Sequence, residues 1–266
     1  MALMHVNFFS DVLGLSVSMD AIIPQTAKSQ IGMKAPAGRK PYKTLYLLHG
    51  MSDDHTIWLR RTSIERYVSE LGIAVIMPST GLGWYTDMAH GLKWMTYISQ
   101  ELPEICRDFF PLSPKREDNY VAGLSMGGYG AMKLGLACGE SFSYAASLSG
   151  ALNMREQAES GETIDPRSGT FWSDIFGPLD KFEGSGNDLL ALAEKRKAKG
   201  SMPKLYQWCG TEDFLYEQNL AFRDHALKLG YDLTYKESPG DHEWIYWDER
   251  IQDVLNWLPI HGGQNP

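Results

Sequence analysis

The stretch Tyr120-Val-Ala-Gly-Leu-Ser-Met-Gly-Gly-Tyr-Gly-Ala131 constrains the fold more than any other part of the chain. It is typical of a strand over residues 119–122, a tight turn around Ser125, and a helix that follows at once. Gly123 and Gly127 flank the serine, and a Cβ at either position would collide with the opposite limb of the turn. Such a turn exposes the serine hydroxyl and aims the first amides of the helix at whatever the serine attacks. The pattern predicts nucleophilic acyl transfer, most simply ester hydrolysis.

The motif alone also fits a glycine-rich turn with an idle serine, because short motifs occur by chance. The order of the other functional residues decides between the two interpretations. In proteins with this turn, an acid and then a histidine follow the serine along the chain. Asp213 lies in the turn after a strand over 205–209, and His242 lies in the loop after a strand over 233–237. Both loops are expected at the same sheet edge as Ser125, which favours a Ser125–His242–Asp213 triad.

Two acidic residues compete with Asp213. Glu212 precedes it by one position and is expected to point the other way, and it is kept as the alternative acid. Asp241 is adjacent to His242, and consecutive side chains rarely hydrogen-bond in the required geometry. Asp213 is therefore our first choice.

Each member of the triad has an expected role. Ser125 Oγ attacks the ester carbonyl, His242 takes the proton and returns it to the leaving alcohol, and Asp213 fixes the imidazole tautomer. The oxyanion requires two backbone N–H donors. We expect one from Met126, the residue after the nucleophile, and one from Met51 in the loop after a buried strand, with Gly50 as the alternative.

Alternating strands and helices indicate an α/β protein with a mostly parallel sheet covered on both faces. Residues 6–10 and 13–23 alternate as an antiparallel pair at the start. We predict a single α/β-hydrolase domain over 1–266, with a mixed eight-stranded sheet. Residues 151–200 have no strand of their own and are predicted to be a cap-like insertion. The other strands are expected at 44–48, 74–77, 119–122, 145–149, 205–209 and 233–237, and helices at 64–71, 95–109, 128–137, 217–229 and 249–258.

Aromatic residues beyond the strand ends are candidates for the substrate pocket. In the insertion, 170–177 is either a helix that packs on the body of the protein or one that covers the substrate. The candidates are Trp58, Trp84, Tyr85 and Phe214 on loops, and Trp172 and Phe176 in the insertion.

Composition and motif content exclude several other classes. The chain has 25 basic and 33 acidic residues, a net charge of −8, which argues against nucleic acid and anionic membranes as partners. No zinc, P-loop or dinucleotide motif occurs, so neither metal nor cofactor is expected. The first 17 residues lack a basic region before an apolar run, no stretch approaches a membrane span, and three scattered cysteines argue against a disulfide framework. A cytoplasmic location is expected.

Five motifs together resemble the esterase D-like family of α/β-hydrolases: His49-Gly-Met-Ser52, Trp84-Tyr-Thr-Asp87, Gly123-Leu-Ser-Met-Gly-Gly-Tyr-Gly130, Gly210-Thr-Glu-Asp213 and Gly240-Asp-His-Glu-Trp244. Within it, the chain looks most similar to bacterial tributyrin or acetyl esterases and cinnamoyl (feruloyl) esterases. The resemblance implies serine carboxylesterase activity on a small-molecule ester with a short acyl chain. It assigns the same triad and the same two oxyanion donors, and it implies a homo-oligomer.

Two other functions remain open. One branch of the family hydrolyses S-formylglutathione, but it carries elbow histidines where this chain has Leu124 and Tyr129, and a loop cysteine where this chain has residues 52–54. A non-catalytic binding protein on the same scaffold is a remote alternative, because the order serine, aspartate, histidine is intact.

Overall fold

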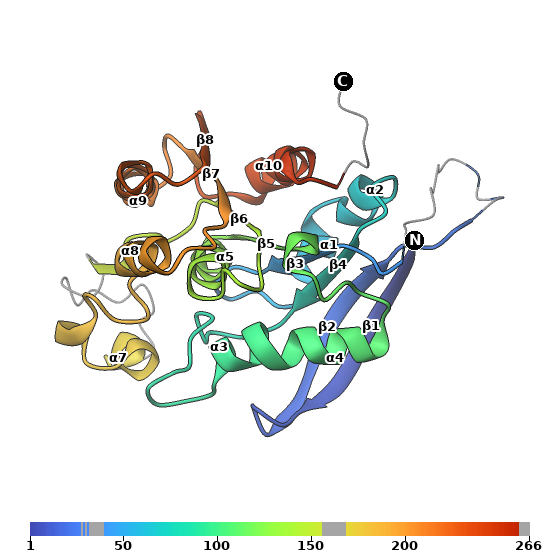
Figure 1. The fold of residues 1–266 in the computed structure, drawn as a ribbon, viewed down its shortest axis with the longest axis horizontal. Helices are drawn as coiled ribbons and strands as arrows, with labels where there is room; N and C mark the ends of the chain where they lie inside the picture. The colour runs from blue at the N-terminus through green and yellow to red at the C-terminus, as the bar shows by residue number, and fades with distance from the viewer. Residues whose placement is uncertain (28, 30, 32–39, 156–168, 261–266) are drawn as a thin grey trace.

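The computed structural model describes residues 1–27, 29, 31, 40–155 and 169–260, which build one eight-stranded sheet covered by helices (Figure 1). The strand order is β1-β2-β4-β3-β5-β6-β7-β8. β1 pairs antiparallel with β2, β2 pairs antiparallel with β4, and all other neighbours are parallel. The predicted mixed, mostly parallel α/β-hydrolase sheet is therefore confirmed. The strands are β1 (Ala2–Ser10), β2 (Leu15–Ile23), β3 (Thr44–Leu48), β4 (Ala74–Pro78), β5 (Asn119–Leu124), β6 (Tyr144–Leu148), β7 (Lys204–Gly210) and β8 (Leu233–Ser238).

Helical segments connect the parallel strands and cover both faces of the sheet (Figure 1). Every residue of β3, β4 and β5 is buried, as expected for central strands with helices on either side. The segments are α1 (Ile57–Arg61), α2 (Ile64–Val68), α3 (Trp94–Thr96), the π-helix η1 (Tyr97–Glu101), α4 (Leu102–Phe109), the 3₁₀ turn η2 (Arg116–Asp118), α5 (Met126–Ala137), α7 (Phe171–Phe176), the 3₁₀ turn η3 (Leu179–Lys181), α8 (Leu189–Lys199), α9 (Tyr216–Leu229) and α10 (Trp244–Trp257).

Two apolar clusters lie on opposite faces of the sheet. One joins α1, α2 and α10 to the strands through residues such as Trp58, Val68 and Ile251. The other joins α4, α5, α8 and α9 through residues such as Leu134 and Phe222. The parallel strands are thus fixed from both sides, and the loops at their carboxyl ends project from a rigid support.

Several helices differ from the sequence prediction, among them α1, which was not predicted, and the 95–109 helix, which is divided into α3, η1 and α4. α10 begins at Trp244, five residues before the predicted start, because the buried Trp247 packs its first turn on the sheet. α8 was not predicted, although its signals are present in the sequence. Asp188 accepts hydrogen bonds from the Leu190 and Ala191 amides as the N-cap, and Gly200 follows the last turn.

The predicted insertion over residues 151–200 contributes α7, η3 and α8. Residues 156–168 of it lie outside the described residues. The described part contains no strand, as expected, and α8 packs against α5 and α9. The insertion is therefore attached to the helix that follows the nucleophile turn.

Candidate active site

Ser125 occupies the turn between β5 and α5 in a strained backbone conformation. Its φ is 51° and its ψ is −119°, which non-glycine residues rarely adopt. A Cβ on Gly123 would come within 2.3 Å of the Gly127 carbonyl oxygen, and one on Gly127 would come within 2.5 Å of the Leu48 carbonyl oxygen. The two glycines therefore allow the backbone contacts that hold this turn closed.

The structure brings Ser125, His242 and Asp213 together from three different loops. His242 Nε2 lies 3.0 Å from Ser125 Oγ, and His242 Nδ1 lies 2.8 Å from Asp213 Oδ2. Asp213 is buried, and its Oδ1 accepts a hydrogen bond of 2.9 Å from the Leu215 amide. This geometry suits proton transfer from the serine to the imidazole, with the carboxylate holding the Nδ1 proton.

Glu212, the alternative acid, bonds the backbone of Gly240 instead of His242. Its carboxylate accepts a hydrogen bond from the Gly240 amide, and its own amide donates to the Gly240 carbonyl at 3.0 Å. The Gly240 hydrogen bond lowers the pKa of Glu212. Glu212 thus joins the loop of Asp213 to the loop of His242 without contacting the imidazole.

Two aromatic rings enclose the imidazole of His242. Phe214 lies 4.7 Å away between ring centroids, and Trp247 lies 4.8 Å away in an edge-on arrangement. Trp247 is itself fixed, because its Nε1 donates to Ser149 Oγ at 3.1 Å in the core. Sequence reasoning missed Trp247 because nothing local separates it from the other tryptophans of α10.

The loop after β3 is held by a buried histidine. The Thr80 amide donates to His49 Nε2 at 3.0 Å, so the proton resides on Nδ1, which donates to the Gly50 carbonyl at 2.7 Å. Burial lowers the pKa of His49 to about 4, so the ring is neutral at physiological pH. The sequence places His49 only at a strand end, and the structure adds its role as a support for this loop.

Residues 50–53 form a turn beside Ser125. The Asp53 amide donates to the Gly50 carbonyl at 3.3 Å, and Ser52 has a φ of 68°. Burial raises the pKa of the Asp53 carboxyl to about 6, against the opposing effect of a hydrogen bond from the Gly50 amide. An amide engaged in this way is not free for an oxyanion, which favours Met51 over Gly50 as the second donor. The Met126 amide begins α5 and has no acceptor within the helix.

A cavity of about 180 Å³ opens beside the serine and the histidine. Trp84 and Phe214, two of the six expected pocket aromatics, line it. Sequence reasoning missed the other lining residues outside the triad and the oxyanion loop, although Leu215 follows Phe214 directly and Gln218 lies one helical turn further. The full lining is Met51, Trp84, Ser125, Ala151, Met154, Phe214, Leu215, Gln218 and His242.

Trp58 and Tyr85 do not line this cavity, which corrects the sequence prediction. Trp58 is fully buried on the other face of the sheet, and its Nε1 donates to the Leu48 carbonyl at 3.0 Å. Tyr85 is also fully buried, and its hydroxyl donates to the His49 carbonyl at 2.9 Å. Both side chains satisfy carbonyls at the end of β3, so they support the oxyanion loop from within the core.

Trp172 and Phe176 are a second correction, because they lie behind the cavity wall. The Trp172 ring lies 5.0 Å from Trp84 in an edge-on contact and 5.8 Å from Phe176 in a stacked one. Neither residue lines the cavity. Of the two interpretations of residues 170–177, the helix that packs on the body of the protein is the one observed.

The part of the chain that the structure describes contains no group of three or more His, Cys, Asp or Glu residues that could hold a metal ion. None of its helices combines the length and apolar character needed to cross a bilayer. All three cysteines are free thiols.

Comparison with known proteins places this geometry in a family. The family model named Esterase matches residues 28–258. An acetyl esterase of Caldicellulosiruptor saccharolyticus is 33% identical over 97% of this chain and 98% of its own length. The substrate-bound structure of fluorophosphonate-binding serine hydrolase F from Staphylococcus aureus has a TM-score of 0.86 and 36% identity, covering 97% of this chain and 98% of that one. An S-formylglutathione hydrolase from the same organism has a TM-score of 0.83 and 35% identity over the same shares. The tight turn that presents a partly exposed Ser125, in a chain that these relatives match over nearly its whole length, identifies the protein as a member of the esterase family.

Proposed function

We propose that the protein is a serine carboxylesterase that cleaves short-chain acyl or small aryl esters through an acyl-enzyme. The observation that carries the proposal is the continuous hydrogen-bonded line from Asp213 through His242 to Ser125, which ends at an apolar cavity. Acyl transfer needs a nucleophile, a base and an orienting acid in this order.

The reaction follows from the positions of the three side chains. Ser125 Oγ attacks the ester carbonyl carbon while His242 Nε2 accepts the serine proton. The tetrahedral intermediate collapses, the C–O bond to the alcohol breaks, and the imidazolium returns its proton to the leaving oxygen. Water, activated by the same imidazole, then attacks the acyl-serine and releases the carboxylic acid. Asp213 stabilises the imidazolium in both halves of the reaction.

The negative charge that develops on the carbonyl oxygen is assigned to the Met126 and Met51 amides. One preorganised donor of this kind is worth about 3 kcal/mol in comparable sites. Both positions are supported from the core, Met126 by the turn that Gly123 and Gly127 allow, and Met51 by His49 and Tyr85.

The small size of the cavity supports a preference for a short acyl group. Its volume of about 180 Å³ lies below the range of roughly 300–1,000 Å³ found for pockets that bind drug-sized ligands. Trp84 and Met154 are bulky parts of the wall, and Gln218 adds one polar group. The similarity to an acetyl esterase supports the same preference.

An S-formylglutathione thioesterase is the second candidate, favoured by the 35% identical S. aureus hydrolase. The elbow residues in which this chain departs from that branch, Leu124 and Tyr129, are both buried and do not line the cavity. Neither departure therefore removes a contact with an acyl group bound in this cavity.

The test is a kcat/KM series on p-nitrophenyl esters from acetate to dodecanoate, with methyl ferulate and S-formylglutathione alongside and Ser125→Ala as the blank. We expect a steep fall beyond butyrate and little turnover of ferulate. A kcat/KM for S-formylglutathione far above that for acetate would replace the ester proposal by the thioesterase. A flat dependence on chain length would refute the assignment of the cavity as a short acyl pocket.

A further inference from the structure

Lys133 is a buried lysine on α5, behind the nucleophile turn. Its exposed fraction is 3%, and its Nζ donates to Thr86 Oγ1 and to Asn187 Oδ1, both at 2.6 Å. The ammonium also lies 5.5 Å from the centroid of the Tyr129 ring. These partners are neutral, and no ion pair of Lys133 occurs among the residues that the structure describes. The charge of Asp87 favours the ammonium form from a distance, but a buried cation without a contacting carboxylate is still costly.

A contribution to stability does not explain why a lysine is buried at position 133. A methionine would fill a similar space without desolvating a charge, and replacing buried charged groups by apolar ones is often neutral or stabilising. Burial lowers the pKa of Lys133 to about 7, which reflects this cost.

The first hydrogen bond leads to one wall of the cavity. The Thr86 hydroxyl that accepts from Lys133 donates in turn to the Trp84 carbonyl at 2.9 Å. Trp84 and Tyr85 both have a φ of 48°, a conformation that bulky residues adopt only when their surroundings impose it. Lys133 thus helps to hold the strained backbone that presents the Trp84 ring to the cavity.

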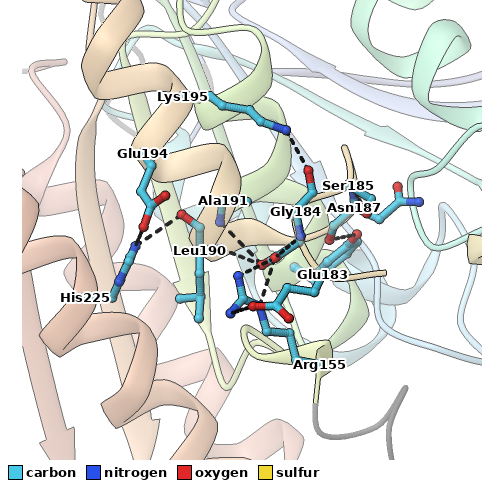
Figure 2. Close-up of polar contacts among 12 residues, drawn as sticks. Arg155, Glu183, Gly184, Ser185, Asn187, Leu190, Ala191, Glu194, Lys195 and His225 are labelled. Carbon is cyan, nitrogen blue, oxygen red and sulfur yellow. Dashed lines mark hydrogen bonds and ion pairs between the residues drawn. The ribbon is translucent and has the colours of Figure 1, made fainter. Parts of the chain in front are cut away.

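The second hydrogen bond leads toward another part of the cavity wall. The Asn187 side-chain oxygen accepts a hydrogen bond from Lys133, and the Asn187 backbone carbonyl accepts one of 2.8 Å from the Tyr129 hydroxyl. The next residue, Asp188, caps α8 and accepts a hydrogen bond of 2.8 Å from Arg155 Nε. Figure 2 shows the Arg155 side chain beside the segment 183–191, which lies further along the same chain. Arg155 directly follows Met154, which lines the cavity.

Since Lys133 is connected to two parts of the cavity wall, we propose that it is a positioning residue that sets the separation of Trp84 and Met154 and thereby the acyl-chain length that the enzyme accepts. The inference rests on the proposed esterase function, because it treats the cavity as the acyl pocket. Lys133 touches no reacting atom and acts only through Thr86 and through the Asn187–Asp188–Arg155 connection.

The test compares kcat/KM for p-nitrophenyl acetate and octanoate in the wild type and in Lys133→Met. A matched control is Lys228→Met, which removes an exposed lysine from α9. We expect the acetate-to-octanoate ratio to fall by about tenfold or more in Lys133→Met, since room for one extra methylene in a hydrophobic pocket is already worth about tenfold or more. Lys228→Met should keep the wild-type ratio. A purely structural role would instead lower the melting temperature and reduce both rates by the same factor.

A second variant keeps the inference testable if Lys133→Met does not fold. Asn187→Ala removes one acceptor of Lys133 and leaves the lysine in place, and it should lower the ratio in the same direction by a smaller factor. A ratio within about twofold of the wild type in every folded variant of this pair would overturn the role of Lys133. Failure of the underlying function is distinguishable, because the wild type would then show no ester hydrolysis above Ser125→Ala.

Discussion

Gly127→Ala is the sharpest test of why the chain forms this nucleophile turn. Gly127 lies in the first turn of α5, where alanine is the better helix former by about 1 kcal/mol. Helix propensity alone therefore predicts a stabilised protein. The packing predicts the opposite, because the added Cβ would lie 2.5 Å from the Leu48 carbonyl oxygen and 2.6 Å from the His49 carbonyl oxygen.

The magnitude follows from which atoms must move. Both oxygens belong to the backbone at the end of β3, where Trp58 Nε1 and the Tyr85 hydroxyl hold them, so neither can rotate away as a side chain would. Overpacking of this kind costs about 3 kcal/mol. After the gain in helix propensity, the net loss in the free energy of unfolding is about 2 kcal/mol, which corresponds to a fall in Tm of about 4–8 °C in a chain of this size.

Differential scanning calorimetry measures the change in Tm, and Gly186→Ala is the matched control. A Cβ on Gly186 would have no atom within 4 Å, so this variant should stay within about 2 °C of the wild type. Gly127→Ala should also lower kcat, since the same clash displaces Ser125 and the Met126 amide. A Gly127→Ala protein with wild-type Tm and kcat would refute the argument from backbone packing.

Two further predictions concern charge. Asp213→Asn should lower kcat about 10³- to 10⁴-fold because the imidazole loses the acceptor that fixes its tautomer. Glu212→Gln should stay within about tenfold, since the Glu212 carboxylate bonds the Gly240 amide and the Thr211 side chain rather than the imidazole. Equal losses in steady-state kinetics would contradict the assignment of the acid. Because burial lowers the pKa of Lys133 to about 7 in the folded protein, the unfolded chain binds that proton more strongly at higher pH, and the free energy of unfolding should rise as pH increases above about 7. In urea denaturation between about pH 6.5 and 8.5, the free energy of unfolding should depend less on pH in Lys133→Met than in the wild type. The same pH dependence in both proteins would refute the lowered pKa of Lys133.

Local sequence patterns were enough to predict much of the fold and of the candidate site. The 44–48 strand has its predicted bounds, and the antiparallel start and the parallel remainder of the sheet were both predictable. Ser125, Asp213 and His242 could be selected because each follows a recognisable strand, and parallel strands bring their carboxyl ends to one edge. The left-handed backbone of Ser125 likewise follows from the flanking glycines.

The residues that line the pocket were harder to predict from the sequence, because a loop side chain can face either the cavity or the core. Trp84 and Tyr85 are neighbours with the same φ, yet Trp84 lines the cavity and Tyr85 bonds the His49 carbonyl. Lys133 had no local signal either, since its partners lie 47 and 54 residues away in sequence. The hydrogen bond to Asn187 depends on how residues 151–200 pack on α5, and the one to Thr86 depends on the loop after β4. Residue patterns along one segment do not encode either contact.

The central claim is that Ser125 is a nucleophile activated by His242, and covalent labelling tests it most directly. Purified protein is incubated with a fluorophosphonate probe, and the modified peptide is identified by mass spectrometry in the wild type, Ser125→Ala and His242→Asn. We predict one label per chain, on Ser125, absent in Ser125→Ala and formed far more slowly in His242→Asn. An unlabelled Ser125 in folded wild-type protein, or a label of equal rate in His242→Asn, would contradict the account.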